Sequence, residues 1–205
     1  GGTTSYYVSQ TLRGCVGDRA EIKVRINTTP KPAVTTPVEY CQNTTASPLA
    51  AQGENLKWYR EATATESQTN PFTPFTANVG TYSFYVTQTG SNKCESPKEE
   101  IKVRIKPLPS ATISGDKAIS LGQSAEVLVN FTGDGPWNYV LSNGLSGRTT
   151  QNPLRVQVSP QRTTTYLVTE VSNECGKGTP NGSAMVTVLI PTISTGNPTT
   201  ASLCA

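Results

Sequence analysis

Residues Gly80–Lys106 read GTYSFYVTQTGSNKCESPKEEIKVRIK, and they repeat a stretch already present at Gly2–Asn27, GTTSYYVSQTLRGCVGDRAEIKVRIN. The hexapeptide EIKVRI is identical in the two copies, and the second copy has one more residue in the turn before it. The repeat period is about 80 residues, which is too long for a solenoid and typical of small β-sandwich domains arranged in series. We therefore expect an all-β chain of repeated sandwiches.

The two halves of the first copy alternate apolar and polar residues, the pattern of half-buried strands. Tyr6 and Val8 share one face of the first segment, and Ile22 and Val24 share one face of the second. Together they predict a hairpin. Because residues 1–27 match only the last third of the repeat unit, we interpret them as the C-terminal strands of a truncated repeat.

A complete unit is predicted for residues 33–106. The segments VEYCQ, PLAAQ and NLKWY precede its hairpin and have the composition of short strands. Trp58 lies on the third of them, where immunoglobulin-like (Ig-like) sandwiches keep a core tryptophan, and we expect Phe84 to lie in the same core. Gly80-Thr81-Tyr82 has the pattern of the tyrosine corner of such sandwiches.

A second, divergent Ig-like/PKD-like domain is predicted for residues 110–190. Its alternating segments place Trp137 and Tyr166 in the core, the latter at the position that Phe84 holds in the preceding unit. Residues 192–205 are interpreted as the start of a following repeat.

Short proline-containing linkers separate these units, at Thr28–Pro32 and at Pro107–Pro109. Proline fixes its own φ and pushes the preceding residue toward extended geometry, so that the linkers are expected to be semi-rigid. The predicted fold class is therefore all-β, with tandem Ig-like β-sandwich domains joined by short proline-containing linkers.

The composition argues against catalysis and against metal, cofactor or nucleic-acid binding. The chain has no histidine, which removes the commonest general base and metal ligand, and its five cysteines form no CxxC pair. The net charge of +3 is spread along strands, whereas nucleic-acid binding favours a concentrated basic stripe. No apolar run reaches the roughly 18 residues of a membrane span, so we expect no membrane insertion in this segment.

Only four carboxylates are candidates for a catalytic or calcium-binding site. Glu99 and Glu100 are neighbours on one strand and are expected to be solvated or paired with Lys98 and Lys102 rather than catalytic. Asp116 and Asp134 each follow a glycine and are expected to support turns; calcium binding is the alternative, although the DxDxDG spacing is missing.

The stretches YCQNTTASPLAAQGENLKWY, GTYSFYVTQTGSNKCES and IKVRI resemble the Ig-like repeats of very large surface and secreted proteins of Bacteroidetes, including gliding-motility adhesins. The segments GDGPWNYVLSNG and SPQRTTTYLVTEVSNECG resemble modules found beside those repeats. The resemblance implies an extracellular location on the bacterial cell surface, reached by type IX secretion.

The resemblance also implies a disulfide between Cys41 and Cys94, because relatives tend to pair a cysteine near the first strand with one in the last hairpin. A Cys15–Cys41 bridge across the linker is the alternative. Cys175 is left without a partner in this scheme, and Cys15 and Cys204 would pair with residues outside the sequence. Widely spaced cysteines in a Thr-rich β chain fit an oxidising compartment.

Three tyrosines, Tyr7, Tyr59 and Tyr85, face away from the predicted core residues. Exposed rings on a sandwich face could stack on sugars or on a neighbouring domain. The alternative is cross-strand packing that covers the sheet.

Two functions follow from these features. The first is a non-enzymatic structural or adhesive segment of a large cell-surface adhesin, a semi-rigid stalk whose partners are neighbouring repeats of the same chain and surface glycans or other cell-surface proteins. The alternative is an accessory carbohydrate-binding module of a secreted glycoside hydrolase.

Overall fold

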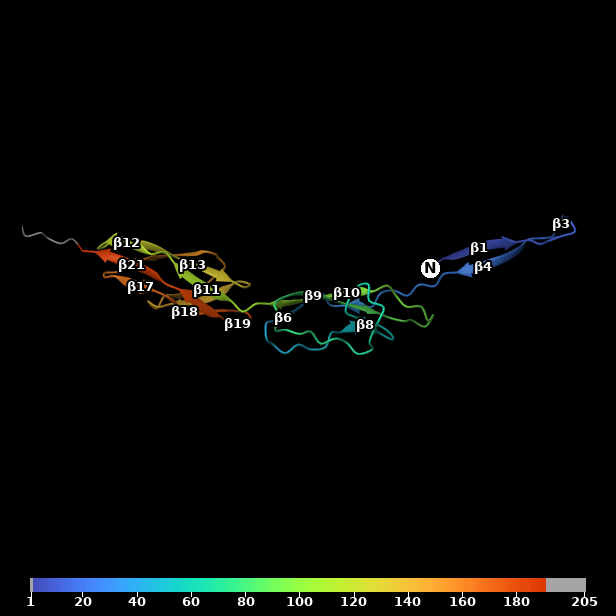
Figure 1. Cartoon of the computed structure of the whole chain (residues 1–205), viewed down its shortest axis with the longest axis horizontal. Helices are drawn as coiled ribbons and strands as arrows, with labels where there is room; N and C mark the ends of the chain where they lie inside the picture. The colour runs from blue at the N-terminus through green and yellow to red at the C-terminus, as the bar shows by residue number, and fades with distance from the viewer. Residues whose placement is uncertain (1, 191–205) are drawn as a thin grey trace, which may run out of the picture. The chain divides into compact units, whose positions relative to one another are not determined.

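The computed structural model describes residues 2–190, and all regular structure within that range is β-strand (Figure 1). The chain divides into two units, Gly1–Lys106 and Pro107–Ala205. The prediction of an all-β fold with Ig-like sandwiches is confirmed. The start of a following repeat, predicted at 192–205, lies outside the described residues.

The first copy of the repeated stretch forms an isolated hairpin. Strand β1 (Thr3–Val8) pairs with β4 (Ala20–Arg25) in antiparallel register, and a small ladder of β2 (Thr11–Leu12) and β3 (Cys15–Val16) lies in the connection between them. Every residue of these four strands is exposed to solvent. The hairpin is thus a two-stranded sheet with no core of its own.

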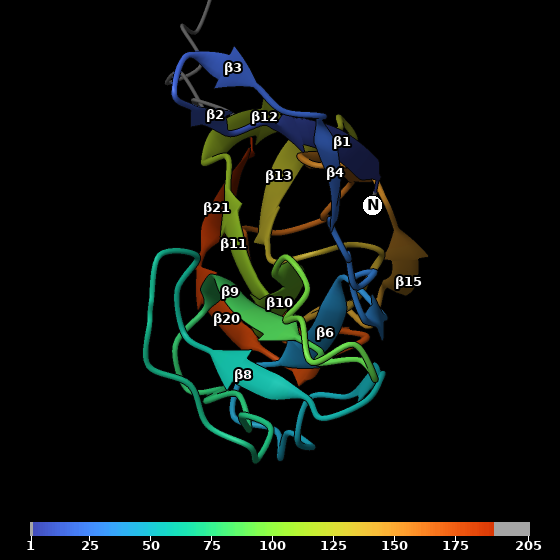
Figure 2. The same ribbon diagram turned by 90° about the vertical axis from the view of Figure 1, so that its right-hand side faces the viewer.

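Residues 33–106 form a sandwich around one four-stranded sheet, in which the second copy of the repeat is central (Figure 2). The order is β6-β10-β9-β8, with bounds Val38–Cys41 for β6, Glu99–Lys106 for β10, Gly80–Thr87 for β9 and Lys57–Tyr59 for β8. The β6–β10 pairing is parallel, and the other two pairings are antiparallel.

The opposite layer of this sandwich is largely irregular. It contains the short ladder of β5 (Ala33–Val34) and β7 (Ala51–Gln52), and residues 72–79 form a loop. Its apolar residues still cover the sheet. The buried core consists of Leu49, Trp58, Phe72, Val86, Ile101, Val103 and Ile105.

Tyr82 lies near the start of β9 with an exposed side chain. Its hydroxyl donates to the carbonyl of Asn78, four residues upstream, at 3.1 Å. This is the hydrogen bond of a tyrosine corner, which holds the entry into β9.

The second unit is a more regular sandwich with three sheets, of order β16-β13-β11-β20, β12-β21-β17 and β15-β14-β18-β19. The strands, in chain order, are β11 Ser110–Ser114, β12 Lys117–Ser120, β13 Ala125–Thr132, β14 Trp137–Leu141, β15 Ser146–Thr149, β16 Leu154–Val158, β17 Thr164–Tyr166, β18 Val168–Asn173, β19 Gly176–Lys177, β20 Thr179–Gly182 and β21 Ala184–Leu189. Strand β13 alternates buried and less buried residues along its length, as its sequence predicts.

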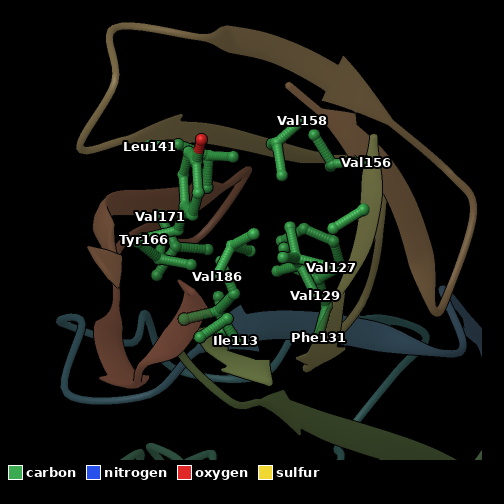
Figure 3. Close-up of a cluster of buried hydrophobic side chains, with 14 of the residues drawn as sticks. Ile113, Val127, Val129, Phe131, Leu141, Val156, Val158, Tyr166, Val171 and Val186 are labelled. Atoms are coloured by element: carbon green, nitrogen blue, oxygen red, sulfur yellow. The ribbon is translucent and has the colours of Figure 1, made fainter. Parts of the chain in front are cut away.

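The core of this unit lies between the sheets and is rich in β-branched residues (Figure 3). Val127, Val129 and Phe131 project from β13 toward Val186 of β21 and Ile113 of β11. The Phe131 ring stacks on Trp137 with centroids 5.1 Å apart, and the Trp137 indole nitrogen donates to the carbonyl of Thr132 at 3.0 Å. Such an aromatic pair stabilises the core by more than the apolar area that it buries.

The first strand of each domain changes partner along its length. In the second unit β11 pairs with β13 and β20, and β12 then pairs in parallel with β21. Gly115 lies between β11 and β12, and Gly182 lies at the end of β20, just before β21. Both glycines have positive φ. The Asp116 carboxylate accepts a 2.7 Å hydrogen bond from the Met185 amide across this break, so it supports the turn, in line with the structural interpretation.

Substituting alanine at Gly182 and at Gly122 separates the effect of close packing on stability from the effect of backbone strain. A Cβ at Gly182 would lie 2.5 Å from the Ile113 carbonyl oxygen, whereas one at Gly122 would meet nothing within 4 Å; both residues have positive φ. We expect Gly122→Ala to lower the free energy of unfolding by about 1 kcal/mol, and Gly182→Ala by about 3 kcal/mol because β11 and β20 must separate. Hydrogen exchange of the β11 and β21 amides in the full chain measures both; equal losses would contradict the packing argument.

Candidate functional site

The four aromatic residues predicted for the cores lie as follows. Trp58 is buried in the core of residues 33–106, and Phe84 is partly buried against it. Trp137 and Tyr166 are buried in the core of the second unit. Trp137 is therefore not available as a ligand-stacking surface.

The three tyrosines proposed for surface recognition do not form one surface. Tyr7 is exposed on the hairpin, and Tyr85 is partly buried on β9. Tyr59 pairs with Tyr85 across β8 and β9 but is only 6% exposed, which corrects the expectation that it faces solvent. A cluster of charged side chains and a loop cover its ring.

This cluster is centred on the carboxylate of Glu95, and we call Lys57, Tyr59, Thr87, Glu95 and Lys98 the Glu95 clasp. Glu95 accepts hydrogen bonds from the Tyr59 hydroxyl, from Thr87 at 2.7 Å and from Lys57 at 2.8 Å. The Lys98 ammonium lies 4.0 Å from the centroid of the Tyr59 ring, a cation–π contact.

Lys98 also fixes the loop that follows β8. Its ammonium donates to three backbone carbonyls, those of Glu61, Ala62 and Ala64, at 3.3, 2.8 and 2.5 Å. Three donors meet three acceptors, so that its hydrogen-bonding capacity is used in full. The clasp thereby holds loop 60–66 over the outer face of the sheet.

The hydrogen bonds determine the protonation state of Glu95. The bond from Lys57, followed by those from Tyr59 and Thr87, lowers the pKa of Glu95 from its usual value of 4.5 to about 2. The bond to Glu95 in turn raises the pKa of Lys57. A carboxylate that accepts three hydrogen bonds within the domain and has a pKa far below neutral is a poor general acid or base near pH 7, so we interpret the clasp as structural.

A surface with the composition of a recognition site lies beside the clasp, around Arg60. Its members are Arg60, Phe75, Asn78 and Tyr82, and we call it the Arg60 surface. Phe75 is 73% exposed, and the Arg60 guanidinium lies over the buried Phe72 ring, 4.6 Å from its centroid. Exposed aromatic and arginine side chains are the residues most enriched where proteins bind partners.

Two hollows adjoin Arg60. One, of about 280 Å³, is lined by Thr73, Pro74 and Phe84 together with the Arg60 surface. The other, of about 320 Å³, is lined by the buried Trp58 and Phe72 and by the exposed Glu61, Glu66 and Gln68. Arg60 and Phe75 were missed from the sequence because they lie on irregular segments, where no strand alternation indicates which side chains are exposed.

The cysteines differ from the predicted pairing. Cys94 and Cys15 have free thiols, whereas Cys41 and Cys175 are disulfide-bonded. The predicted Cys41–Cys94 bridge is therefore wrong, and Cys175 is not left without a partner. Cys94 lies in a turn that is held by other bonds: its amide donates to the Asn92 side chain at 3.0 Å, and its carbonyl accepts from Thr29 at 2.7 Å. Cys204 lies outside the described residues.

Metal-binding clusters of cysteine, aspartate and glutamate are absent from residues 2–190. Asp134, the other candidate turn aspartate, has its carbonyl bonded by the Asn173 side chain at 2.9 Å. In the described part of the chain we find no helix with the length and apolar character to cross a membrane.

Comparison with known proteins finds one family model that matches part of the chain. Residues 30–107 match the family model described as "Ig-like domain CHU_C associated". The match spans the unit that contains the Glu95 clasp and the Arg60 surface. No curated protein matches the chain.

Several solved structures are similar to the chain at low identity. A titin I-band fragment, I67–I69, is 10% identical with a TM-score of 0.39, covering 93% of this chain and 75% of that one. The D00–D0 domain of intimin is 9% identical with a TM-score of 0.41, covering 76% and 98%. Fibronectin(III)-like modules of Clostridium thermocellum CbhA are 14% identical with a TM-score of 0.31, covering 76% and 90%. Similarities at this level say nothing of what the chain binds.

The lowered pKa of Glu95 predicts a pH-dependent contribution to stability. The contribution is present above the unfolded-state pKa near 4.5 and is lost as the pH falls toward about 2. We expect Glu95→Gln to lower the free energy of unfolding at pH 7 by about 1 kcal/mol, a modest value because the side chain is 36% exposed and partly screened. Urea unfolding of the full chain, followed by hydrogen exchange of β9 and β10, measures this difference at each pH.

Glu126→Gln is the matched control, because Glu126 is similarly exposed and also bonds a cation, Arg155, at 2.6 Å, but its carboxylate has no other partner in the described structure. We expect it to change stability by less than about 0.5 kcal/mol. A Glu95→Gln deficit that is as large at pH 2 as at pH 7 would show that the carboxylate's charge is not what stabilises the clasp.

Proposed function

We propose that this chain is a non-enzymatic structural segment of a large bacterial cell-surface adhesin, in which Ig-like domains act as a semi-rigid stalk. The observation that carries the proposal is the parallel pairing of entry and exit strands: β6 with β10 in one domain, β12 with β21 in the other. Parallel strands run in the same direction, so that the chain enters a domain at one end of the sheet and leaves it at the other. Such a domain adds length to a chain.

Contacts of the linkers support stiffness. Thr29 is buried, and its hydroxyl donates to the Cys94 carbonyl at 2.7 Å. The Gln88 side chain donates to the Pro30 carbonyl at 2.8 Å, and Lys31 forms a 2.9 Å ion pair with Glu99. The residues before the domain are therefore bonded to its last hairpin, and the linker has little freedom.

The second linker is held in a similar way by the domain that follows it. The Thr179 amide donates to the Pro109 carbonyl at 3.1 Å. A Cβ at Gly178 would lie only 1.9 Å from the same carbonyl oxygen, so the backbones are in close contact. A linker that packs on its own domain favours a stalk over a flexible tether.

The proposed location is the bacterial cell surface. The disulfide-bonded Cys41 and Cys175 support an oxidising compartment. Neighbouring repeats of the same chain are the proposed partners, together with surface glycans or other cell-surface proteins. Type IX export and a role in gliding motility remain part of this proposal through the family resemblance.

The Arg60 surface favours a second candidate function, an accessory carbohydrate-binding module of a secreted glycoside hydrolase. Exposed rings such as Phe75 and Tyr82 offer flat apolar faces on which sugars can stack. Glycan-array binding that is lost in Phe75→Ser, but kept in the control Leu167→Ser on the second unit, would favour this candidate over the stalk.

The stalk proposal predicts that the first linker is as ordered as the strands. We expect backbone order parameters of about 0.85 for residues 28–32, and values below about 0.6 when they are replaced by Gly and Ser. Thr29→Val, which keeps both prolines but removes the buried hydroxyl, should give intermediate values. NMR relaxation measures these parameters, and small-angle scattering of the same proteins should show a larger maximum dimension for the native linker. A native linker below about 0.6, or a folded-back native particle, would contradict the proposal.

A further inference from the structure

Strand β9 has an open edge over its first half. Strand β8 is the edge strand of this sheet, and it pairs only with the end of β9 (Figure 2). Tyr59 lies opposite Tyr85, so a longer β8 would bring Glu61 opposite Ser83. The chain instead leaves the sheet after Tyr59. Residues 80–84 therefore have no neighbouring strand on this side within the described part of the chain.

The hydrogen bonds of Trp58 show which way the main-chain groups of β9 point. Trp58 and Gln68 exchange two backbone hydrogen bonds, at 2.8 and 3.0 Å, on the side of β8 that faces away from β9. Because the groups of successive residues alternate in direction, Tyr59 points its amide and carbonyl toward β9. Its partner Tyr85 therefore points its own toward β8.

The same alternation directs the amides and carbonyls of Ser83 and Thr81 toward the open side, as for Tyr85. Lys102, which lies opposite Ser83 on β10, agrees with this assignment. Its amide donates to the Thr36 hydroxyl at 2.9 Å, on the side of β10 away from β9. Main-chain partners for Thr81 and Ser83 are absent among residues 2–190. An unpaired edge of this kind is a template for an added strand.

The Glu95 clasp keeps this edge open. Lys98 binds the carbonyls of Glu61, Ala62 and Ala64, the residues with which β8 would otherwise continue along β9. A carbonyl that accepts from Lys98 on the outer face is not directed at β9. The chain after β8 is thereby held in a loop beside the sheet.

A hollow lies next to the open edge. It is the 280 Å³ hollow described above, which we call the Arg60 hollow, and Tyr82 and Phe84 of β9 contribute to its lining. Arg60 is the only charged residue that lines it. In the described structure the Arg60 guanidinium lies over the Phe72 ring and makes no ion pair or hydrogen bond. Its donors are therefore free to bind a carboxylate, next to the exposed ring of Phe75.

We propose that the open edge of β9 and the Arg60 hollow together bind an extended, acidic peptide segment of a partner protein. The segment adds as a strand, and its main chain pairs with Thr81 and Ser83. Its side chain opposite Tyr82 points to the same face as Tyr82, where an aspartate or glutamate binds Arg60. Main-chain pairing gives affinity, and the hollow selects the acidic side chain.

The main-chain groups favour a peptide over a sugar as the ligand. Donors and acceptors that alternate along 81–83 match the repeat of an extended polypeptide. The single unpaired cation in the lining favours an acidic segment over a basic one. The inference does not rest on the stalk proposal, and it competes with the carbohydrate candidate for the same surface.

Hydrogen exchange of the full chain tests the open edge itself. We expect the amides of Thr81 and Ser83 to exchange on the order of 100-fold faster than those of Tyr82 and Phe84, which alternation directs at β10. Slow exchange at all four amides would show that the edge is already covered and would overturn the proposal.

Random heptapeptides displayed on phage are the probe for binding. Selection against the full chain should enrich proline-free sequences that contain aspartate or glutamate between β-branched residues. An enriched peptide, made synthetically, should slow exchange at Thr81 and Ser83 by on the order of 10-fold at saturation. Exchange at Tyr82 and Phe84 should not change.

Variants separate the charge from the main-chain pairing. Arg60→Gln should weaken peptide binding by on the order of 10-fold, whereas Arg162→Gln, an exposed arginine of the second unit, should not. Thr81→Pro removes an amide that makes no bond to β10, and the preceding Gly80 tolerates a following proline. We expect it to weaken binding by about 5-fold, and Thr81→Ala, which keeps the amide, to have no effect.

Several results would overturn the proposal. They are the absence of any enriched peptide, peptide binding that is unchanged in Arg60→Gln, and binding that leaves exchange at Thr81 and Ser83 unchanged. Polygalacturonate that binds through Arg60 while no peptide is enriched would assign the hollow to acidic sugars. Protection of the two amides that rises with protein concentration, without peptide, would assign the edge to a second copy. None of these readouts depends on the order of the linkers, so failure here and failure of the stalk proposal are distinguishable.

Discussion

The parallel pairing between the first and last strands of each domain is the interaction on which the structure depends. In residues 33–106 it covers the edge of β10, and in the second unit it joins β11 to β20 and β12 to β21. Without it, the last strand of the domain would present an unpaired edge. It also determines the path of the chain, since a domain closed in this way has its entry and exit at opposite ends of the sheet.

Contacts next to this pairing hold the linkers and the outer face of the sheet in place. The turn before β10 provides acceptors for Thr29 and holds Glu95, so it organises both the linker and the outer face of the sheet. In the second unit the equivalent constraint is a close backbone contact at Pro109 and a switch of sheets at Gly115 and Gly182. Different local contacts thus support the same topology in the two domains. The domains can therefore share a fold although their sequences have diverged.

Much of the fold could be predicted from the sequence, because strand alternation and the internal repeat are local signals. The core positions of Trp58, Trp137 and Tyr166 follow from a period of two. Tyr59 could not be placed this way, because alternation gives the face of a sheet but not whether a loop covers that face. The loop is held by Lys98, which lies far along the chain, and no pattern in the sequence links the two.

The candidate site was harder to predict than the fold. The Arg60 surface lies on irregular loops, for which periodicity carries no information. The cysteine pairing that the family resemblance implies is wrong: Cys94 has a free thiol, and its turn is held by a hydrogen bond from the Thr29 hydroxyl to the Cys94 carbonyl and by one from the Cys94 amide to the Asn92 side chain. Regular elements were therefore predictable, whereas contacts between loops were not.

The central claim is that the parallel first and last strands hold each domain together along the direction of the chain. Single-molecule pulling tests it most directly, with force applied to the full chain through residues 31 and 108. In that geometry the β6–β10 hydrogen bonds are loaded together in shear. The account predicts a clearly higher unfolding force than when the same domain is pulled through residues 88 and 98, where β9 and β10 open one bond at a time. Equal forces in the two geometries would contradict it.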